Sequence, residues 1–253
     1  MKRVDLNCDM GELPGMLTDG SQGSLMRFVT SANVACGGHA GNEEMMRATI
    51  EQALRHGVAV GAHPGYEDRD NFGRVELQLT PEEIRDSVYR QLITLALVAG
   101  KCGARVMHVK PHGALYNQAA KDAVIARAIA AGVRLCTNDV IMVGLAGSVM
   151  LDEFRAAGFR VAAEAFADRR YEKDGTLRAR KFRDALLDAP EHAAEQAVRI
   201  AEGQGVLTRE GTVVPVEAQT ICVHSDTPGA ELIAEAVRKA IEAAGVGVRA
   251  LKH

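Results

Sequence analysis

The sequence contains no tryptophan, and all aromatic residues together make up only 4% of it. This scarcity excludes a core built around large stacked rings. Apolar residues still account for 47% of the 253 positions, so the core must consist mainly of Ala, Val, Leu, Ile and Met. Small and branched side chains let helices approach a sheet closely, as they do in α/β proteins.

Long hydrophobic runs are absent as well. No segment reaches the roughly 18 consecutive apolar residues that a membrane helix requires. Residues 1–6 lead directly into an apparent strand, with no apolar stretch typical of a signal peptide before it. The formal net charge of −3 indicates no basic surface for nucleic acid. We therefore expect a cytoplasmic protein that binds a small molecule and has no membrane or nucleic-acid partner.

Two further motifs are missing. The five cysteines include no C-x-x-C pair, and their odd number and wide spacing argue against a disulfide framework. We expect most of them to be buried thiols. No G-x-x-x-x-G-K-[ST] motif occurs, so a nucleotide would have to bind in another way or on a partner protein.

Short apolar runs alternate with longer helical patterns along the whole chain. The runs are continuous, which is typical of strands buried on both faces of a parallel sheet. The predicted strands are Val4–Cys8, Ala32–Cys36, Val58–Ala62, Arg105–Val109, Val140–Val143, Val161–Phe166 and Thr220–Val223. This alternation predicts one α/β domain over residues 1–253, whose sheet is either open or closed into a (β/α) barrel.

Start and stop signals mark the predicted helices. Thr80-Pro81-Glu82-Glu83 forms a capping box with proline at the first helical position. Further starts are predicted at Asn42, Asp188 and Thr227-Pro228, and further ends at Gly57, Gly100, Gly132, Gly158, Gly203 and Gly245. Two long connections, 11–24 and 169–187, have the length of functional loops.

Nearly every predicted strand ends in ionisable or amide side chains. Asp5, Asn7 and Asp9 follow a period of two, which places them on one side of their strand. Unpaired acids inside a barrel would be very unfavourable, so they should pair with each other or with a ligand. The other polar strand ends are Glu12, Asn33, His39, His63, His108, Lys110, His112, Glu164, Asp168, Arg169, His224 and Asp226. Since parallel α/β enzymes carry their sites at strand C-termini, these residues predict one shared active site.

Seven ordered motifs closely resemble the LamB/YcsF family, which includes the A subunits of prokaryotic 5-oxoprolinases. The resemblance runs from about residue 4 to about residue 230. The motifs begin with D-L-N-C-D-M-G-E, S-A-N-V-A-C-G-G-H-A-G and G-A-H-P, at residues 5–12, 31–41 and 61–64. They continue with F-G-R, V-K-P-H-G-A-L-Y-N, E-A-F-A-D-R and V-H-S-D-T-P-G, at residues 72–74, 109–117, 164–169 and 223–229.

The resemblance implies an irregular seven-stranded barrel similar to the glycoside hydrolase/deacetylase barrels. It also implies that 5-oxoproline (pyroglutamate) is opened to L-glutamate, with ATP as co-substrate and with partner subunits B and C.

Such a reaction needs a cation at developing charge, a base for water and a clamp for the substrate carboxylate. We assign candidate catalytic roles to Asp9, Lys110, His112, Glu164 and Asp226. The candidate substrate-binding residues are Asp5, Asn7, Glu12, Asn33, His39, His63, Arg169 and His224.

Two other functions fit the same residues. Asp9, His39 and His63 form a possible divalent-metal set, which would suit a deacetylase-like hydrolase of carbohydrates or amides that needs no ATP. Alternatively, the chain is a non-catalytic component that binds substrate. The basic segment 169–183, with a predicted turn at Asp174-Gly175, is a solvated loop, a lid over phosphates or a docking surface.

Overall fold

Seven parallel strands close into a barrel in the computed structural model, which describes residues 2–252. The barrel strands are β1 (Arg3–Met10), β2 (Ser31–Ala35), β3 (Ala59–His63), β4 (His108–Val109), β5 (Ile141–Leu145), β6 (Arg160–Phe166) and β9 (Thr220–Cys222). β9 completes the barrel because it pairs with both β6 and β1. Thr220 lies at this junction, beside Asp5 on one side and Glu164 on the other. The predicted irregular seven-stranded barrel is confirmed, although β4 is shorter than its apolar run suggested.

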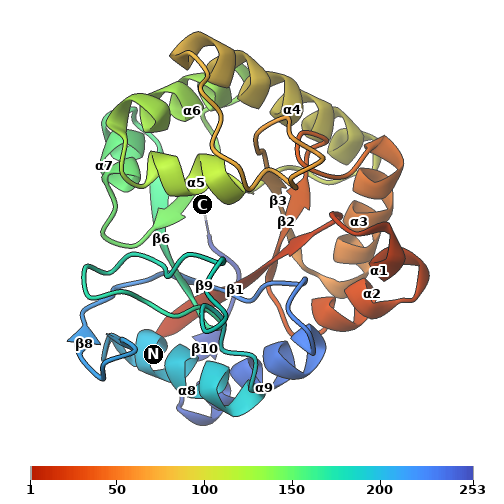
Figure 1. Cartoon of the computed structure of the whole chain (residues 1–253). Helices are drawn as coiled ribbons and strands as arrows, with labels where there is room; N and C mark the ends of the chain where they lie inside the picture. Colours follow the sequence, from red (N-terminus) through yellow and green to blue (C-terminus); the bar gives the residue numbers. More distant parts are fainter. Residues whose placement is uncertain (1, 253) are drawn as a thin grey trace.

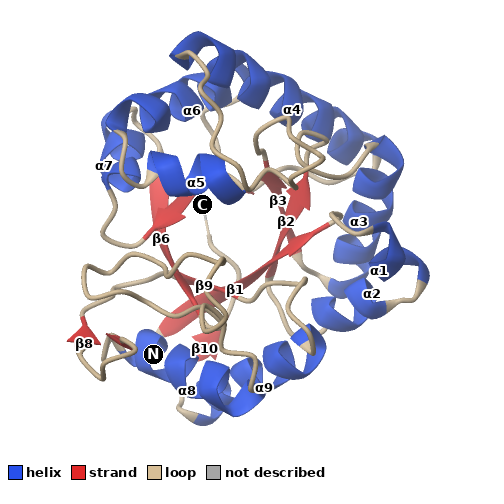
Figure 2. Cartoon of the chain, viewed as in Figure 1, coloured by secondary structure: helices blue, strands red, loops and turns tan. Residues whose placement is uncertain are grey.

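Helices surround the strands, and at least one helix follows each barrel strand along the chain (Figures 1 and 2). The helices are α1 (Pro14–Thr18), α2 (Ser21–Met26), α3 (Glu43–His56), α4 (Pro81–Lys101), α5 (Gly113–Ala119), α6 (Ala123–Cys136), α7 (Val149–Ala156), α8 (Pro190–Glu202) and α9 (Ala230–Ala243). Across residues 2–252, no helix has the length and apolar character needed to cross a bilayer.

Three short strands lie outside the barrel. β10 (Gly247–Val248) pairs with the beginning of β1, and β7 (Val206–Leu207) forms an antiparallel pair with β8 (Val213–Val214). The segment 169–187 is drawn in teal in Figure 1 and doubles back on itself through bridges Arg169–Leu186 and Tyr171–Leu177. Its predicted turn is confirmed, since Gly175 has φ +80° and its N–H donates to Glu172 O.

Several helix signals act as predicted. Thr80 and Glu83 form the reciprocal capping box of α4, and the Asn42 side chain accepts from Met45 N at the start of α3. Gly57 and Gly203 end α3 and α8 in left-handed conformations.

Four helix signals were wrong. Gly100 does not end α4, which continues to Lys101. α8 begins after Ala189, so Asp188 does not cap it. α9 begins after Gly229, because the Thr227 hydroxyl instead donates to Asp168. Gly132 lies inside α6, where a Cβ would come within 2.5 Å of Arg85 O of α4, so it permits close helix packing rather than ending the helix.

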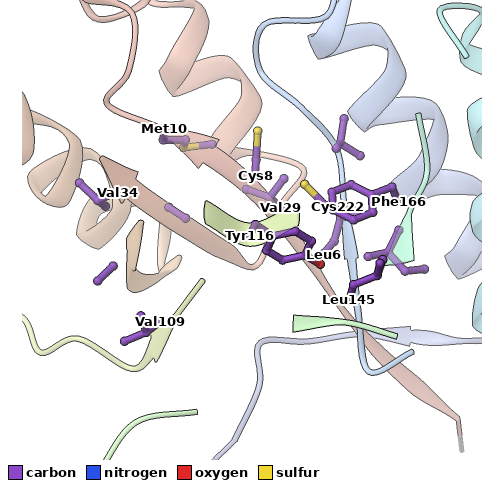
Figure 3. Close-up of a cluster of buried hydrophobic side chains, with 14 of the residues drawn as sticks. Leu6, Cys8, Met10, Val29, Val34, Val109, Tyr116, Leu145, Phe166 and Cys222 are labelled. Carbon is purple, nitrogen blue, oxygen red and sulfur yellow. The ribbon is translucent and has the colours of Figure 1, made fainter. Parts of the chain in front are cut away.

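The two faces of β1 have different environments. Leu6, Cys8 and Met10 belong to the buried apolar cluster shown in Figure 3. The alternating residues Asp5 and Asn7 instead bond to side chains from other strands inside the barrel. The apolar face thus packs the barrel wall against the helices, while the polar face builds the interior.

Candidate active site

The deepest of the polar residues is Asp5, in the first half of β1. Its carboxylate accepts hydrogen bonds of 2.6–2.7 Å from the hydroxyls of Thr30, Ser31 and Thr220. Burial raises the pKa of Asp5 above its usual value even though these hydrogen bonds oppose the shift. Asp5 therefore braces β1 against β2 and β9, below the barrel mouth.

One layer higher, Lys110 forms the centre of a buried ionic network. Its Nζ lies 3.0 Å from Asp9 Oδ1, 2.9 Å from Glu164 Oε1 and 3.1 Å from Cys222 Sγ. Burial lowers the pKa of Lys110, but the surrounding charges, Asp9 foremost, raise it well above its ordinary value. The ammonium group is therefore a fixed positive charge whose donors already have partners.

Two amide side chains connect this network to neighbouring strands. Asn33 Nδ2 donates to Asn7 Oδ1 at 2.7 Å and to Asp9 Oδ1 at 2.8 Å. Asn33 Oδ1 lies 2.7 Å from His108 Nε2, and Asn7 Nδ2 donates to Glu164 Oε1 at 2.9 Å. These contacts hold β1, β2, β4 and β6 in one polar layer, as expected for buried groups that must satisfy each other.

A cluster of three histidines and one glutamate forms the next level. Glu12 Oε1 lies 2.9 Å from His39 Nε2, 3.2 Å from His112 Nδ1 and 3.7 Å from His63 Nε2. The His39 and His112 rings stack with centroids 3.7 Å apart. Burial lowers the pKa of His39 to about 4 and also lowers that of His112. Burial likewise acts against a charged His63, but Asp9 and Glu12 outweigh it and raise that pKa.

His224 forms a separate dyad with Asp168. Its Nδ1 lies 2.9 Å from Asp168 Oδ1, and its backbone N–H donates to Asp168 Oδ2 at 3.1 Å. Burial alone would raise the pKa of Asp168, but the contacts with His224 lower it to about 2. An ionised carboxylate at Nδ1 favours the tautomer that has its proton there, which leaves Nε2 as a base.

Arginines from two loops surround the mouth. Asp226 pairs with Arg74 and, at 3.0 Å, with Arg180. Burial of Asp226 acts to raise its pKa, but Arg180 and its other cationic neighbours lower it. Arg169 is buried and its Nε has no hydrogen-bond partner, while its Nη2 donates to Arg178 O at 2.6 Å. No carboxylate within the described chain forms an ion pair with Arg169, so this guanidinium can receive an anion.

These groups face one cavity of about 490 Å³ at the C-terminal ends of the strands. The predicted site residues that line it are Asp9, Glu12, His63, Lys110, His112, Arg169, His224 and Asp226. The remaining predicted site residues, Asp5, Asn7, Asn33, His39 and Glu164, do not line it, but all except Asp5 contact side chains that do. We call this cavity, defined by its lining residues, the mouth pocket.

Sequence reasoning assigned no site role to several residues at the pocket. Arg74 and Tyr116 line it, and Cys222 contacts Lys110 beneath it. Arg180 also lines it and was indicated only as part of the basic segment 169–183. The period of two over Thr220, Cys222 and His224 was a usable signal for Cys222, since alternate residues of a strand share a face. Arg74 and Arg180 lie in loops, where no period indicates which side chains turn inward.

The thiols fit the expectation of buried packing groups. Cys8, Cys36 and Cys222 are buried, and burial raises the pKa of each, to about 12 for Cys36. A raised pKa disfavours the thiolate that a nucleophile requires.

Comparison with known proteins identifies the family of the chain. The LamB/YcsF family model matches residues 4–253. The chain is 48% identical to the 5-oxoprolinase A subunit of Chloroflexus aggregans, with 98% of this chain and 99% of that protein covered. It is 47% identical to the 5-oxoprolinase A subunit of Bordetella pertussis, with 98% of each covered.

Solved structures give the same result. A lactam utilization protein from Thermus thermophilus superposes with a TM-score of 0.91 at 42% identity, covering 98% of this chain and 100% of that one. A polysaccharide deacetylase from Bacillus cereus has a TM-score of 0.51 at 14% identity, over 100% of this chain and 93% of that one, and this shows a shared barrel fold only. The resemblance found in the seven sequence motifs is confirmed, and the chain belongs to the LamB/YcsF family.

Proposed function

We propose that this chain is the A subunit of a 5-oxoprolinase and that it opens the lactam ring of 5-oxoproline to give L-glutamate with ATP as co-substrate. The names of the similar bacterial proteins support the substrate. The observation that carries the proposal for this chain is the mouth pocket itself. It combines a buried guanidinium free of carboxylates, Arg169, with a histidine–aspartate base, His224–Asp168, in one cavity.

The substrate is an anion with an unreactive amide. Arg169 can bind its carboxylate, since a guanidinium offers donors in a planar fork. Burial and the neighbouring Arg180 lower the pKa of Arg169 to about 10, so it remains charged near neutral pH. No carboxylate among residues 2–252 forms an ion pair with it. The exposed Lys121 and Lys181 at the rim offer further positive charge for the phosphates of ATP.

The chemistry has three steps. The lactam oxygen first attacks the γ-phosphorus of ATP, and the bond from that phosphorus to ADP breaks. Water then adds to the activated carbon, with its proton taken by His224 Nε2, and collapse breaks the carbon–nitrogen bond while the nitrogen gains a proton. A second water cleaves the resulting acyl phosphate to carboxylate and inorganic phosphate.

This geometry revises the roles assigned to two acids. Asp226 is neutralised by two arginines and Asp9 by Lys110, so both are weaker candidates for the general base than His224. Lys110, with its donors engaged, acts by holding Asp9 in place at the pocket floor and not by contacting phosphate. Glu164 supports Lys110 in the same way.

Partner subunits B and C belong to this proposal, because the relatives are named as one subunit of an enzyme. The test is glutamate release from 5-oxoproline and ATP by the chain mixed with candidate B and C proteins, with each component omitted in turn. We expect release only from the complete mixture with ATP present. No glutamate from a mixture in which the complex has been shown by size-exclusion chromatography would reject the assignment.

A further inference from the structure

Two histidine nitrogens, His63 Nε2 and His112 Nδ1, face each other in the mouth pocket at 3.0 Å. His63 Nδ1 lies 2.7 Å from Lys110 O, and His112 Nε2 lies 2.9 Å from Phe72 O. A carbonyl oxygen only accepts hydrogen bonds, so these two ring nitrogens must carry the protons. In the neutral rings, His63 Nε2 and His112 Nδ1 are therefore unprotonated, yet they lie 3.0 Å apart.

The backbone fixes the orientation of His112. Phe72 is the one non-glycine residue of the described chain in a left-handed conformation, with φ +55°. In this conformation its carbonyl oxygen accepts a hydrogen bond from His112 Nε2. Gly73 and Gly65 leave room beside the stacked rings, since a Cβ on Gly73 would come within 2.6 Å of His39. Histidines that bind metals are commonly oriented in this way, by an N–H bond from the second nitrogen to a carbonyl.

Glu12 supplies a third donor at the same point. Its Oε1 lies 3.2 Å from His112 Nδ1 and 3.7 Å from His63 Nε2. Donors bound to one ion at 2.0–2.1 Å lie about 3.0–3.4 Å apart, so the three separations match one face of a coordination polyhedron within a few tenths of an ångström. All three residues line the mouth pocket, which leaves the remaining positions to water or substrate.

We propose that His63 Nε2, His112 Nδ1 and Glu12 Oε1 bind one divalent transition-metal ion of the zinc class. Two imidazoles and one carboxylate favour Zn²⁺, Co²⁺, Fe²⁺ or Mn²⁺ over Mg²⁺ or Ca²⁺. Asp9 Oδ2, 3.4 Å from His63 Nε2, is placed to become a fourth ligand. His39 stacks on His112 and bonds to Glu12, so it supports the set.

This donor set differs from the one the sequence suggested. His112 replaces His39 as the second imidazole ligand. Glu12 replaces Asp9 as the carboxylate ligand, because Asp9 Oδ1 already contacts Lys110. Such an ion would polarise a bound carbonyl or lower the pKa of water. Metal binding here does not depend on the identity of the substrate, so it can be tested without turnover.

The experiment titrates ZnCl₂ and, separately, MnCl₂ into the full chain after chelator dialysis, with isothermal titration calorimetry. We expect one Zn²⁺ per chain, binding more tightly than Mn²⁺. His112→Gln and His63→Gln should each weaken Zn²⁺ binding by about 100-fold or more, because each removes a ligand. The exposed His192→Gln should bind as wild type does.

Two further measurements keep the result clear. His224→Gln tests the other possible donor group, Asp9, Cys222 and His224, and should leave affinity unchanged. Glu12→Gln keeps the shape of its side chain, so melting temperatures with Zn²⁺ and with chelator should differ for wild type but not for this variant. No stoichiometric binding to wild type, or equal loss in His192→Gln and His112→Gln, would overturn the proposal and leave a shared proton between His63 and His112.

Discussion

Lys110 Nζ lies 3.0 Å from Asp9 Oδ1, although β1 and β4 are not neighbours in the sheet. The two side chains meet across the barrel interior, and Glu164 of β6 completes the contact from a third direction. All three are nearly or fully buried. The ionic network therefore ties three separated strands of the barrel together directly beneath the mouth pocket.

Removing the cation from this network should destabilise the fold. Lys110→Met leaves Asp9 and Glu164 buried without their counter-ion, and such a loss lowers the free energy of unfolding by about 3–5 kcal/mol. Urea denaturation measures the change. The control Arg155→Met breaks a solvent-exposed pair with Asp152 and should alter stability by about 1 kcal/mol or less. Equal effects in the two variants would contradict the bracing role.

Arg169 should determine affinity for the substrate carboxylate. Arg169→Lys keeps the charge but loses the planar fork, so KM for 5-oxoproline in the reconstituted complex should rise roughly 10–100-fold with little change in kcat. Steady-state kinetics at saturating ATP gives both constants. Lys173→Met, an exposed change in the same loop, is the matched control. An unchanged KM in Arg169→Lys would exclude this clamp.

His224 should determine kcat instead. His224→Gln removes the base, and loss of a general base lowers the rate by roughly 10²–10⁴-fold. The assay is glutamate release under saturating 5-oxoproline and ATP. A variant that retains more than about half of the wild-type kcat would assign the base to another residue, with Asp9 the next candidate.

The strands were predictable because each is a short, mainly apolar segment between helical patterns, and the capping box at Thr80 marked its helix directly. Closure of the sheet into a barrel could not be predicted from local patterns. It depends on Thr220 pairing with both Asp5 and Glu164, and no local pattern encodes that register. The resemblance to a family supplied the barrel instead. The role of Gly132 could not be predicted either, because the glycine is needed only where α4 packs closely against α6.

The sequence predicted which residues gather at the site, but it did not predict which of their side chains contact each other. Period-two spacing correctly placed Asp5 and Asp9 on the inner face of β1, but it did not indicate depth, and Asp5 lies below the pocket. Which histidine nitrogens face each other depends on the carbonyls of Phe72 and Lys110, and so on loop conformation.

Stability in acid should depend on Asp168. Its contacts with His224 lower its pKa to about 2, against about 3.9 in an unfolded chain, and it is fully buried. An acid with a lowered native pKa stabilises the fold fully above the unfolded value and loses that effect as the pH falls through the native value. The stabilisation, about 2 kcal/mol, should therefore disappear between about pH 4 and pH 2.

Denaturant unfolding of Asp168→Asn from pH 7 to pH 2 tests this dependence. The deficit relative to wild type should be constant above about pH 5 and shrink below about pH 4. Asp152→Asn, at an exposed position, should follow the wild-type curve throughout. A deficit that stays constant down to pH 2 would mean that ionisation of Asp168 contributes nothing.

Gly61 should tolerate no side chain, because the interior of the barrel is filled there. A Cβ at Gly61 would lie 2.0 Å from His108 Nε2, which itself lies 2.7 Å from Asn33 Oδ1. Gly61→Ala must displace the His108 ring from Asn33 and should lower the free energy of unfolding by about 1–3 kcal/mol.

Gly100→Ala is the control with opposite sign, since Gly100 lies exposed within α4 with no atom near its Cβ position. That change should stabilise the chain by about 0.5–1 kcal/mol, because alanine loses less conformational freedom than glycine in a helix. If both changes shifted the urea midpoint in the same direction, the effect would reflect glycine removal in general, and the close contact with His108 could not be its cause.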